Sequence, residues 1–232
     1  MTSNIADIFE SYSVDQLIAL LLQADDLYFN DEQPLVTDAQ YDAIKLHTQR
    51  LAPTNSYFTQ VGSMVRGGKV DLPHKMGSLD QVHHGDAAKW IKKYALDADQ
   101  FVISDKLDGN SLLLAYSPTG KFQSAYTRGD GFQGADVTRH VIKMPSVPKS
   151  ISPTGNVTLI RAESIIAPAN FKRINTGKHS RGGRVYKNPR NCVAGQMNAS
   201  EVSQEMLNVI DCVAYEVVDS TLSKQDQFKF LG

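Results

Sequence analysis

The residues best suited to chemistry lie around Lys106, in the segment Ser-Asp-Lys106-Leu-Asp108-Gly109. A lysine attacks a phosphorus atom only as the neutral amine, a form that burial or neighbouring positive charge favours. Asp108 can orient this amine or a ribose hydroxyl, and Gly109 permits a tight backbone turn. Alone, the pattern Lys-x-Asp-Gly is also that of an ordinary solvated β-turn. The segment therefore supplies a candidate nucleophile, with a plain turn as the alternative.

A second candidate is Arg128, in the segment Tyr126-Thr-Arg-Gly-Asp-Gly131. The two glycines predict a tightly turned loop, and a guanidinium on such a loop binds ribose or phosphate oxygens well. The alternative is a hairpin turn with a surface ion pair.

The segment Arg161-Ala-Glu163 stands within the mostly apolar residues 157–166. A carboxylate inside a strand is costly unless it has a partner, which can be a ligand hydroxyl, a metal ion or the nearby Arg161. Equally, Arg161 can form a structural salt bridge with another acid.

Residues 164–200 contain no Asp or Glu, although the whole chain has a net charge of −1. Such a local basic surface suits phosphate backbones, with a solvated face as the alternative. Its cations are Lys172, Arg173, Lys178, Arg181, Arg184, Lys187 and Arg190. Farther on, Tyr215 can either stack on a purine or belong to the core.

Near the N-terminus, Asp38, Tyr41 and Asp42 fall at i, i+3 and i+4 and share the first turn of a predicted helix. Acids there complement the helix dipole, which is the ordinary explanation. An aromatic ring flanked by carboxylates also suits a flat cation such as oxidised nicotinamide. Tyr28, near the end of the preceding helix, can supply a second aromatic face.

The elements that position these groups fall into two regions. Capping boxes at Ser13 with Gln16 and at Thr37 with Gln40 predict two helices. Their apolar faces are expected at Val14, Leu17, Ile18, Leu21 and Leu22, and at Tyr41, Ile44, Thr48 and Leu51. Residues 1–52 therefore form a small helical domain, and the loop-like residues 53–74 form a linker.

From residue 75 the pattern predicts a helix over 86–98, with Asp86 as the N-cap. β-Type runs follow at residues 101–104, 112–117, 121–127, 157–164 and 209–218. The turn Ser117-Pro-Thr-Gly makes 112–127 a hairpin. The fold class is α+β with mainly antiparallel sheets. In this arrangement Lys106 sits at the end of a strand, rigidly held at the floor of a pocket.

The composition is that of a globular protein, with 41% hydrophobic and 21% charged residues. Cys192 and Cys212 lack the paired spacing of a zinc site, so no structural metal is expected and both thiols are interpreted as packing residues. The N-terminus does not have the pattern of a signal peptide, and the longest apolar run is too short to span a membrane. We expect a soluble, cytoplasmic protein without membrane association.

Taken in order, these segments resemble the bacterial-type NAD-dependent DNA ligases. The stretch from Tyr28 to Asp42 is similar to the domain of that family which binds the nicotinamide mononucleotide half of NAD. Lys106-Leu-Asp-Gly109 resembles the motif with the adenylated lysine. Further matches are Thr127-Arg-Gly-Asp-Gly131, Arg161-Ala-Glu163, Asn188-Pro-Arg-Asn191 and Tyr215. The similarity covers nearly the whole chain, and matches in this order disfavour the plain-turn interpretation of Lys106.

The resemblance implies a nicotinamide mononucleotide-binding domain with its linker at residues 1–74 and an incomplete nucleotidyltransferase (adenylation) domain at 75–232. It makes Lys106, Asp108 and Glu163 catalytic, with NAD and Mg2+ as cofactors and nicked double-stranded DNA as partner. Contacts to NAD are expected from Tyr28, Asp38, Tyr41, Asp42, Ser78, Leu79, Arg128 and Tyr215. Contacts to DNA or phosphate are expected from Arg190, Lys187 and Arg184.

The chain departs from the family pattern at several positions. Phe29 stands for a usual His, Ser104 for Glu, Ala162 for Gly, Asn198 for Arg and Glu216 for Gly. It also stops before the later lysine motifs, the oligonucleotide-binding barrel, the zinc module and the helix-hairpin-helix elements. We therefore expect one subunit of a split, phage-type ligase, whose second chain carries the missing parts, in the host cytoplasm if phage-encoded.

Two other functions fit part of the pattern. A non-catalytic NAD- or partner-binding module that retains the ligase fold is favoured by Ser104 and the missing motifs. An RNA end-joining or capping enzyme shares the lysine motif, but the nicotinamide-type front domain argues against it.

Overall fold

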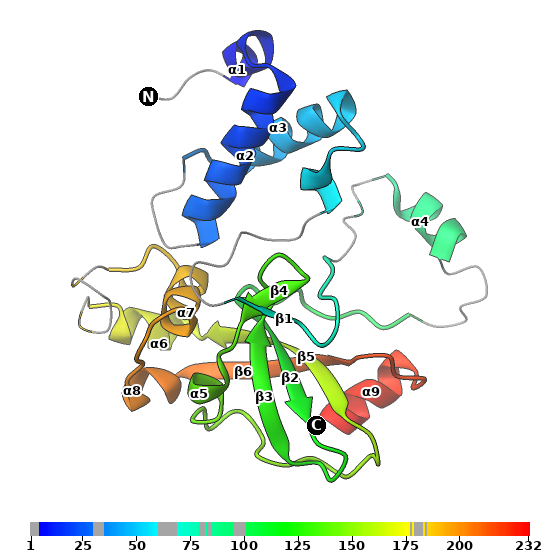
Figure 1. The fold of residues 1–232 in the computed structure, drawn as a ribbon, viewed down its shortest axis with the longest axis vertical. Coiled ribbons are helices and arrows are strands. Elements are labelled where there is room, and N and C mark those ends of the chain that lie inside the picture. The colour runs from blue at the N-terminus through cyan, green and yellow to red at the C-terminus, as the bar shows by residue number, and fades with distance from the viewer. Residues whose placement is uncertain are drawn as a thin grey trace.

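The computed structural model describes residues 5–29, 35–59, 69–78, 82, 85–94, 101–176, 178, 183 and 185–232. A group of helices at the N-terminal end is followed by antiparallel sheets with helices beside them (Figure 1). The α+β fold class is therefore confirmed.

The N-terminal helices form where the capping residues predict them. They are α1 (Ile5–Ser11), α2 (Val14–Phe29) and α3 (Asp38–Leu51), followed by the short 3-10 helix η1 (Ser56–Thr59). Both capping boxes are present, with the Ser13 N–H donating to Gln16 Oε1 at 2.8 Å and the Thr37 N–H donating to Gln40 Oε1 at 3.0 Å. A small core holds these helices together, made of Ile8, Leu17, Leu21, Ile44 and Tyr57.

Two positions on the predicted apolar faces are wrong. Leu22 is 45% exposed and Leu51 is 53% exposed. Neighbouring helix residues point about 100° apart, so Leu21 faces the core and Leu22 cannot. Leu51 is the last residue of α3, where no further helical turn covers its side chain.

The main sheet has the strand order β3-β2-β5-β6, with every neighbouring pair antiparallel. Its strands are β2 (Asn110–Tyr116), β3 (Phe122–Thr127), β5 (Thr158–Ile166) and β6 (Ile210–Val217). The predicted hairpin over 112–127 is confirmed by the pairing of β2 with β3. Because paired residues share a face, Ser111 and Leu113 lie on the same face as Glu163 and Arg161. This face of the sheet is called the site face below.

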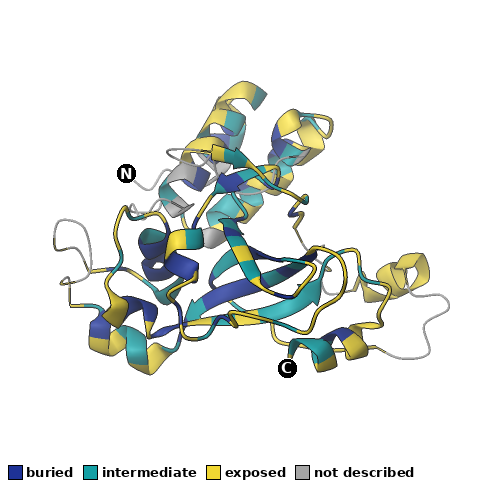
Figure 2. Cartoon of the chain, turned by 60° about the horizontal axis from the view of Figure 1, so that its bottom comes forward, coloured by how far each residue is buried: buried dark blue, intermediate teal, exposed yellow. Residues whose placement is uncertain are grey.

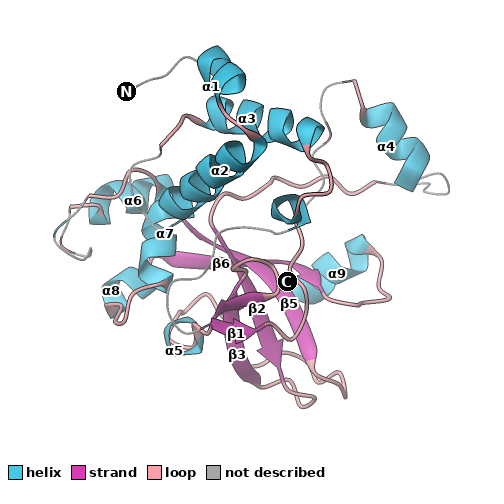
Figure 3. Ribbon diagram, turned by 45° about the horizontal axis from the view of Figure 1, so that its top comes forward, coloured by secondary structure: helices cyan, strands magenta, loops and turns pink. Residues whose placement is uncertain are grey.

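The opposite face carries the main hydrophobic core. Leu112 and Leu114 of β2 and Ile160 of β5 pack there against residues that include Val193 and Met197. The covering helices are α5 (Thr138–Val141), α6 (Pro168–Ile174), α7 (Pro189–Met197) and α8 (Gln204–Leu207), and α9 (Lys224–Leu231) packs beside β6. Buried residues concentrate on the strands and these helices (Figure 2). Helix α2 of the N-terminal group lies against α7 (Figure 3).

A second, two-stranded sheet pairs β1 (Lys69–Asp71) with β4 (Gln133–Ala135). Strand β1 falls in residues 53–74, so the loop interpretation of that stretch is wrong at this point. A strand of three residues is too short to show an alternating pattern in the sequence. It forms because β4, distant along the chain, offers it a hydrogen-bonding partner.

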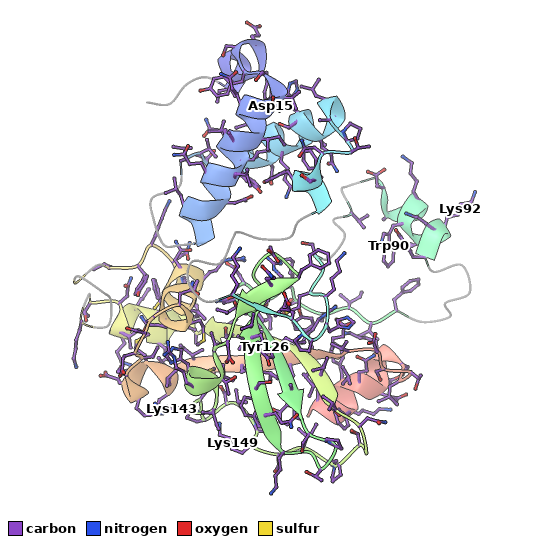
Figure 4. All side chains as sticks on the ribbon, viewed as in Figure 1. Asp15, Trp90, Lys92, Tyr126, Lys143 and Lys149 are labelled. Carbon is purple, nitrogen blue, oxygen red and sulfur yellow. The ribbon has the colours of Figure 1, made fainter. Side chains whose placement is uncertain are left out.

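Of the two elements predicted between residues 86 and 104, the helix forms and the strand does not. Helix α4 (Ala87–Tyr94) is confirmed, but residues 95–98 lie outside the described residues. Trp90 and Lys92 project from α4, which is exposed along its length and lies apart from the sheet (Figure 4). Residues 101–104 do not form the predicted strand, and Ile103 is 94% exposed. Apolar, β-branched residues indicate only a propensity, and the sheet pairs none of its strands with this segment.

The adjacent Leu21 and Leu22 provide a matched test of the N-terminal core. We expect Leu21→Ala to lower the free energy of unfolding by about 2–5 kcal/mol, because it opens a cavity in a core with few members. Leu22→Ala should change it by about 0.5 kcal/mol or less. Urea denaturation followed by circular dichroism measures both. Equal effects of the two variants would contradict the packing described for α2.

Candidate functional site

Glu163, on the site face of β5, is the most tightly held acid of the sheet. The Gly109 N–H donates to its Oε1 at 3.1 Å, and the Ser111 hydroxyl donates to its Oε2 at 2.8 Å. Burial raises the pKa of Glu163, and the hydrogen bond from Ser111 and the charge of Arg190 oppose that rise. Both carboxylate oxygens thus have fixed partners from the segment that follows Lys106.

The partner of Glu163 therefore differs from the arginine that the sequence offered. Arg161 Nη1 instead donates to Glu216 Oε2 at 2.9 Å, which confirms the alternative of a salt bridge with another acid. Ser111 was missed by the sequence reasoning. Its signal was present in the cross-strand register, since Ser111 stands directly opposite Glu163 once β2 and β5 pair.

Gly109 lies too close to β5 for any other residue. A Cβ at this position would stand 2.0 Å from the Ser164 carbonyl oxygen. The glycine of the Lys-x-Asp-Gly segment is thus required by this close approach. It fixes the backbone just after Asp108 against the strand that carries Glu163.

Asp108 and Arg190 form an ion pair across the site, with Arg190 Nη1 2.9 Å from Asp108 Oδ1. Arg190 stands in the first turn of α7, which the side chain of Asn188 caps by accepting from the Asn191 N–H at 2.8 Å. Pro189 takes the first helical position, where a missing N–H costs nothing. The Asn-Pro-Arg-Asn segment is therefore a helix start that places Arg190 at the site.

Arg128 lies at the end of β3, on a turn that its glycines make possible. Gly129 and Gly131 have φ values of 54° and 94°, a region that favours glycine. Asp130 is used by the turn itself, because its Oδ1 accepts from the Phe132 and Gln133 N–H groups. Burial lowers the pKa of Arg128, and the neighbouring charge of Arg190 lowers it further. The predicted tight turn is confirmed.

Tyr215 of β6 completes this group. Burial raises the pKa of its hydroxyl, and the charge of Glu163 adds to the rise. The charges of Glu163 and Arg128 both act on the Tyr215 hydroxyl. The charge of Arg190 acts in turn on Arg128 and Glu163, so these four side chains lie close together. The structure brings together five of the predicted site residues: Asp108, Arg128, Glu163, Arg190 and Tyr215.

Lys106 does not lie in the buried pocket that the sequence predicted. It is exposed, like each of residues 101–105 before it, because the expected strand is absent and no described element packs over the segment. Ser78, Asp42 and Lys187 are exposed as well. The side chains of Tyr28 and Asp38, on α2 and α3, and the residues Leu79 and Arg184 lie outside the described residues.

The N-terminal group contains a buried hydroxyl–carboxylate network. Tyr41 donates its hydroxyl to Asp25 Oδ1 and Tyr57 donates to Oδ2, each at 2.7 Å, and the two hydroxyl oxygens are 3.0 Å apart. Burial raises the pKa of Asp25. Sequence reasoning missed Asp25 and Tyr57, although Asp25 follows Leu17 and Leu21 at helical spacing and so falls on the packed face. The network fixes the ring of Tyr41.

The comparison with protein families decides the relationship of this chain. Residues 68–231 match the family model described as the NAD-dependent DNA ligase adenylation domain. The chain belongs to the NAD-dependent DNA ligases. The model covers β1 and nearly all of the chain that follows, including every residue of the site on the sheet.

Individual ligases show the same similarity. The chain is 31% identical to a DNA ligase of Acanthamoeba polyphaga mimivirus over 98% of its own length and 33% of that protein. It is 29% identical to a DNA ligase of Clostridium kluyveri, over 84% of this chain and 32% of that one. It is 33% identical to a putative DNA ligase of Invertebrate iridescent virus 6, over 89% and 30%. The chain thus spans about a third of the length of these relatives.

The described residues do not form a preformed metal site. In the part of the chain that the structure describes, no three His, Cys, Asp or Glu side chains gather as metal ligands. Asp108 is held by Arg190, and Glu163 by Gly109 and Ser111. Mg2+ usually takes only one or two carboxylates and completes its shell with phosphates and water, so Mg2+ stays a prediction from the ligase resemblance. None of the described helices has the length and apolar character needed to cross a membrane.

The burial of Glu163 predicts a pH-dependent gain in stability for Glu163→Gln. A raised folded-state pKa means that the stability present below the ordinary glutamate pKa is lost as pH rises through the folded pKa. Glutamine removes this loss while keeping the shape. The melting temperature of the variant, relative to the original protein, should therefore rise by a few degrees between about pH 5 and about pH 8.

Asp211→Asn is the matched control for this pH series, because Asp211 is an exposed acid on β6. Its melting temperature relative to the original protein should not change over the same range. A Glu163→Gln difference that stays constant or shrinks as pH rises would show that no charge is buried at this position.

Gly109→Ala should destabilise the ligase fold by about 1–3 kcal/mol, because the added Cβ overlaps the Ser164 carbonyl. Denaturant unfolding measures this loss. The control is Gly77→Ala, at a position where a Cβ meets no heavy atom within 4 Å. If both variants are equally stable, residues 106–109 do not approach β5 as described.

Proposed function

We propose that this chain carries out the adenylation step of DNA nick sealing, with Lys106 attacking the adenylyl phosphorus of NAD. The bond between Lys106 Nζ and phosphorus forms, the bond from phosphorus to the phosphate oxygen of nicotinamide mononucleotide breaks, and the amine proton is released. The observation that supports this step is the convergence of Asp108, Arg128, Glu163, Arg190 and Tyr215 beside the Lys106 segment, in a chain of the NAD-dependent ligase family.

The two arginines suit the phosphates of the dinucleotide. Arg128 is half-buried, and after burial the charge of Arg190, a second cation, has the largest effect in lowering its pKa. Two neighbouring guanidinium groups repel each other unless an anion lies between them, and Arg190 stands at the start of α7, where the helix dipole also attracts anions. A diphosphate bound here relieves that repulsion. It also gains stabilisation for the charge that develops on the reacting phosphate.

The remaining site residues contact the adenine, the ribose and the nicotinamide half of NAD in this proposal. Tyr215 stacks on the adenine, and Glu163, held by Ser111 and Gly109, accepts a ribose hydroxyl. Asp108 exchanges its ion pair with Arg190 for an interaction with the incoming amine. In the N-terminal group, Tyr41 and Asp42 receive the nicotinamide half, with Tyr41 oriented by Asp25.

After adenylation, we propose that AMP passes to the 5′-phosphate of a nick in double-stranded DNA, and the 3′-hydroxyl then displaces it. Arg190, Lys187 and Arg184 contact the DNA phosphates in this proposal. The second protein chain, the Mg2+ requirement and the cytoplasmic location stay predictions at this stage.

A non-catalytic NAD-binding module is the second candidate, and the exposure of Lys106 favours it. The same structure can bind the dinucleotide without bringing the amine to the phosphorus. A test of covalent transfer separates the two functions.

The test uses NAD labelled in the adenylyl phosphate, added to the chain alone and together with the remaining ligase domains of a relative. We expect a protein-bound, acid-labile label that Lys106→Ala abolishes and that Asp108→Asn reduces by at least about tenfold. ATP labelled in the same phosphate should give none. The control Lys121→Ala, at an exposed lysine before β3, should label normally.

Binding of NAD without any covalent label, even with the other domains present, would favour the non-catalytic module. A label that survives in Lys106→Ala would contradict the proposed nucleophile.

A further inference from the structure

Tyr215 lies on an irregularity of the sheet. Arg161 of β5 stands opposite Glu216 of β6, but the next residue, Ala162, stands opposite Ala214. Tyr215 is therefore an extra residue in β6, a β-bulge. A bulge bends its strand and turns a side chain away from the direction that regular pleating would give it. The direction of the Tyr215 ring thus depends on whatever holds this bulge.

Three side-chain contacts hold the bulge in place. Glu216, the residue after Tyr215, is paired with Arg161 at 2.9 Å, and these side chains are only 32% and 19% exposed. Lys224 of α9 donates its ammonium to the Tyr215 carbonyl oxygen. Gln227 of α9 accepts from the Val217 N–H at 3.0 Å. The Arg161–Glu216 pair lies on the site face, and the Lys224 ammonium also lies 6.0 Å from the centroid of the Tyr215 ring.

The same arginine also reaches a second part of the site. Arg161 Nη2 donates to the Lys75 carbonyl oxygen at 2.9 Å. Lys75 belongs to residues 72–78, here called the strap, which also bonds to the Arg128 turn through the Met76 N–H and the Gly131 carbonyl at 2.9 Å. In the strap, Nδ1 of His74 lies 3.4 Å from Oδ2 of Asp219, a residue beyond the end of β6. The strap ends at Ser78, which the ligase resemblance makes a predicted contact to NAD.

Stability alone does not favour this arrangement. Arg161 Nε is buried and has no hydrogen-bond partner within the described structure. A buried donor without a partner costs free energy, and a largely buried ion pair contributes little net stability. The Arg161 guanidinium instead fixes geometry, because one terminal nitrogen bonds to Glu216 at the bulge and the other to Lys75 in the strap.

We propose that Arg161 and Glu216 are positioning residues that set the affinity for the adenine half of the nucleotide. Their ion pair fixes the Tyr215 ring from one side, and the bond from Arg161 to Lys75 fixes the strap from the other. Neither residue touches the nucleotide. This inference rests on the proposed function, since it assumes that Tyr215 and the strap face the adenine.

The test measures binding of AMP and of nicotinamide mononucleotide separately, by calorimetry, to the whole chain. Glu216→Gln keeps the size of the side chain but removes the charge that holds the bulge. Arg161→Lys keeps the positive charge but has one nitrogen where two are needed. We expect each variant to weaken AMP binding by about tenfold, as partial loss of base stacking would. Binding of nicotinamide mononucleotide should stay within about twofold.

A variant that merely unfolds part of the chain would lose both ligands together, so the separate readouts distinguish positioning from a general structural effect. Glu205→Gln is the matched control, because Glu205 pairs with Lys178 at 3.5 Å on the exposed surface. It should leave both affinities unchanged. In the labelling reaction, the positioning variants should raise the KM for NAD more than they lower kcat.

The two possible failures look different. If the original chain binds no AMP at all, the proposed function itself is wrong. If the original chain binds AMP and the Glu216→Gln and Arg161→Lys variants bind it equally well, or lose both ligands by the same factor, the positioning role is overturned.

Discussion

The carboxylate of Glu163 joins strand β5 to the segment that leads from Lys106 into strand β2. One oxygen accepts from the backbone of Gly109 and the other from the hydroxyl of Ser111, so the turn after Lys106 is fastened to β5 at two points. The missing Cβ of Gly109 allows this approach, because the Ser164 carbonyl fills the space. Asp108, next to Gly109, is placed by that attachment, and it pairs with Arg190 from the start of α7. A single buried carboxyl group thus joins β5 to residues 109–111.

Charge arrangement distinguishes this site from an ordinary sheet surface. Two arginines, half-buried Arg128 at the end of β3 and Arg190 at a helix start, stand near each other, and both Glu163 and Asp108 lie close by. The two acids offset part of the repulsion between Arg128 and Arg190, and an anionic ligand bound beside the arginines would offset more of it. In the N-terminal group the buried acid Asp25 has no arginine partner in this network; it accepts hydrogen bonds from the hydroxyls of Tyr41 and Tyr57.

Local patterns in the sequence predicted those parts of the fold that depend on neighbouring residues. The capping boxes at Ser13 and Thr37, the hairpin over 112–127 and the glycine turn around Arg128 are all of this kind. The motif order also identified Asp108, Arg128, Glu163, Arg190 and Tyr215, which the structure gathers in one place.

Features that depend on distant partners could not be predicted in the same way. Strand β1 exists only because β4 pairs with it. The partners of Glu163 and the bulge at Tyr215 follow from cross-strand register, which no local pattern specifies. The strand expected at 101–104 failed for the same reason, since its composition favoured extended backbone but the sheet supplies no neighbour.

The exposure of Phe101, Val102 and Ile103 has a consequence for the timing of catalysis in the proposed function. These side chains and the Lys106 ammonium lie in water, whereas the groups that would receive the amine are already assembled. Bond formation then requires that this segment first bring the Lys106 amine to the bound dinucleotide. In the proposed function a movement of the backbone therefore precedes the exchange at phosphorus, and the apolar side chains supply a driving force for it as they become covered.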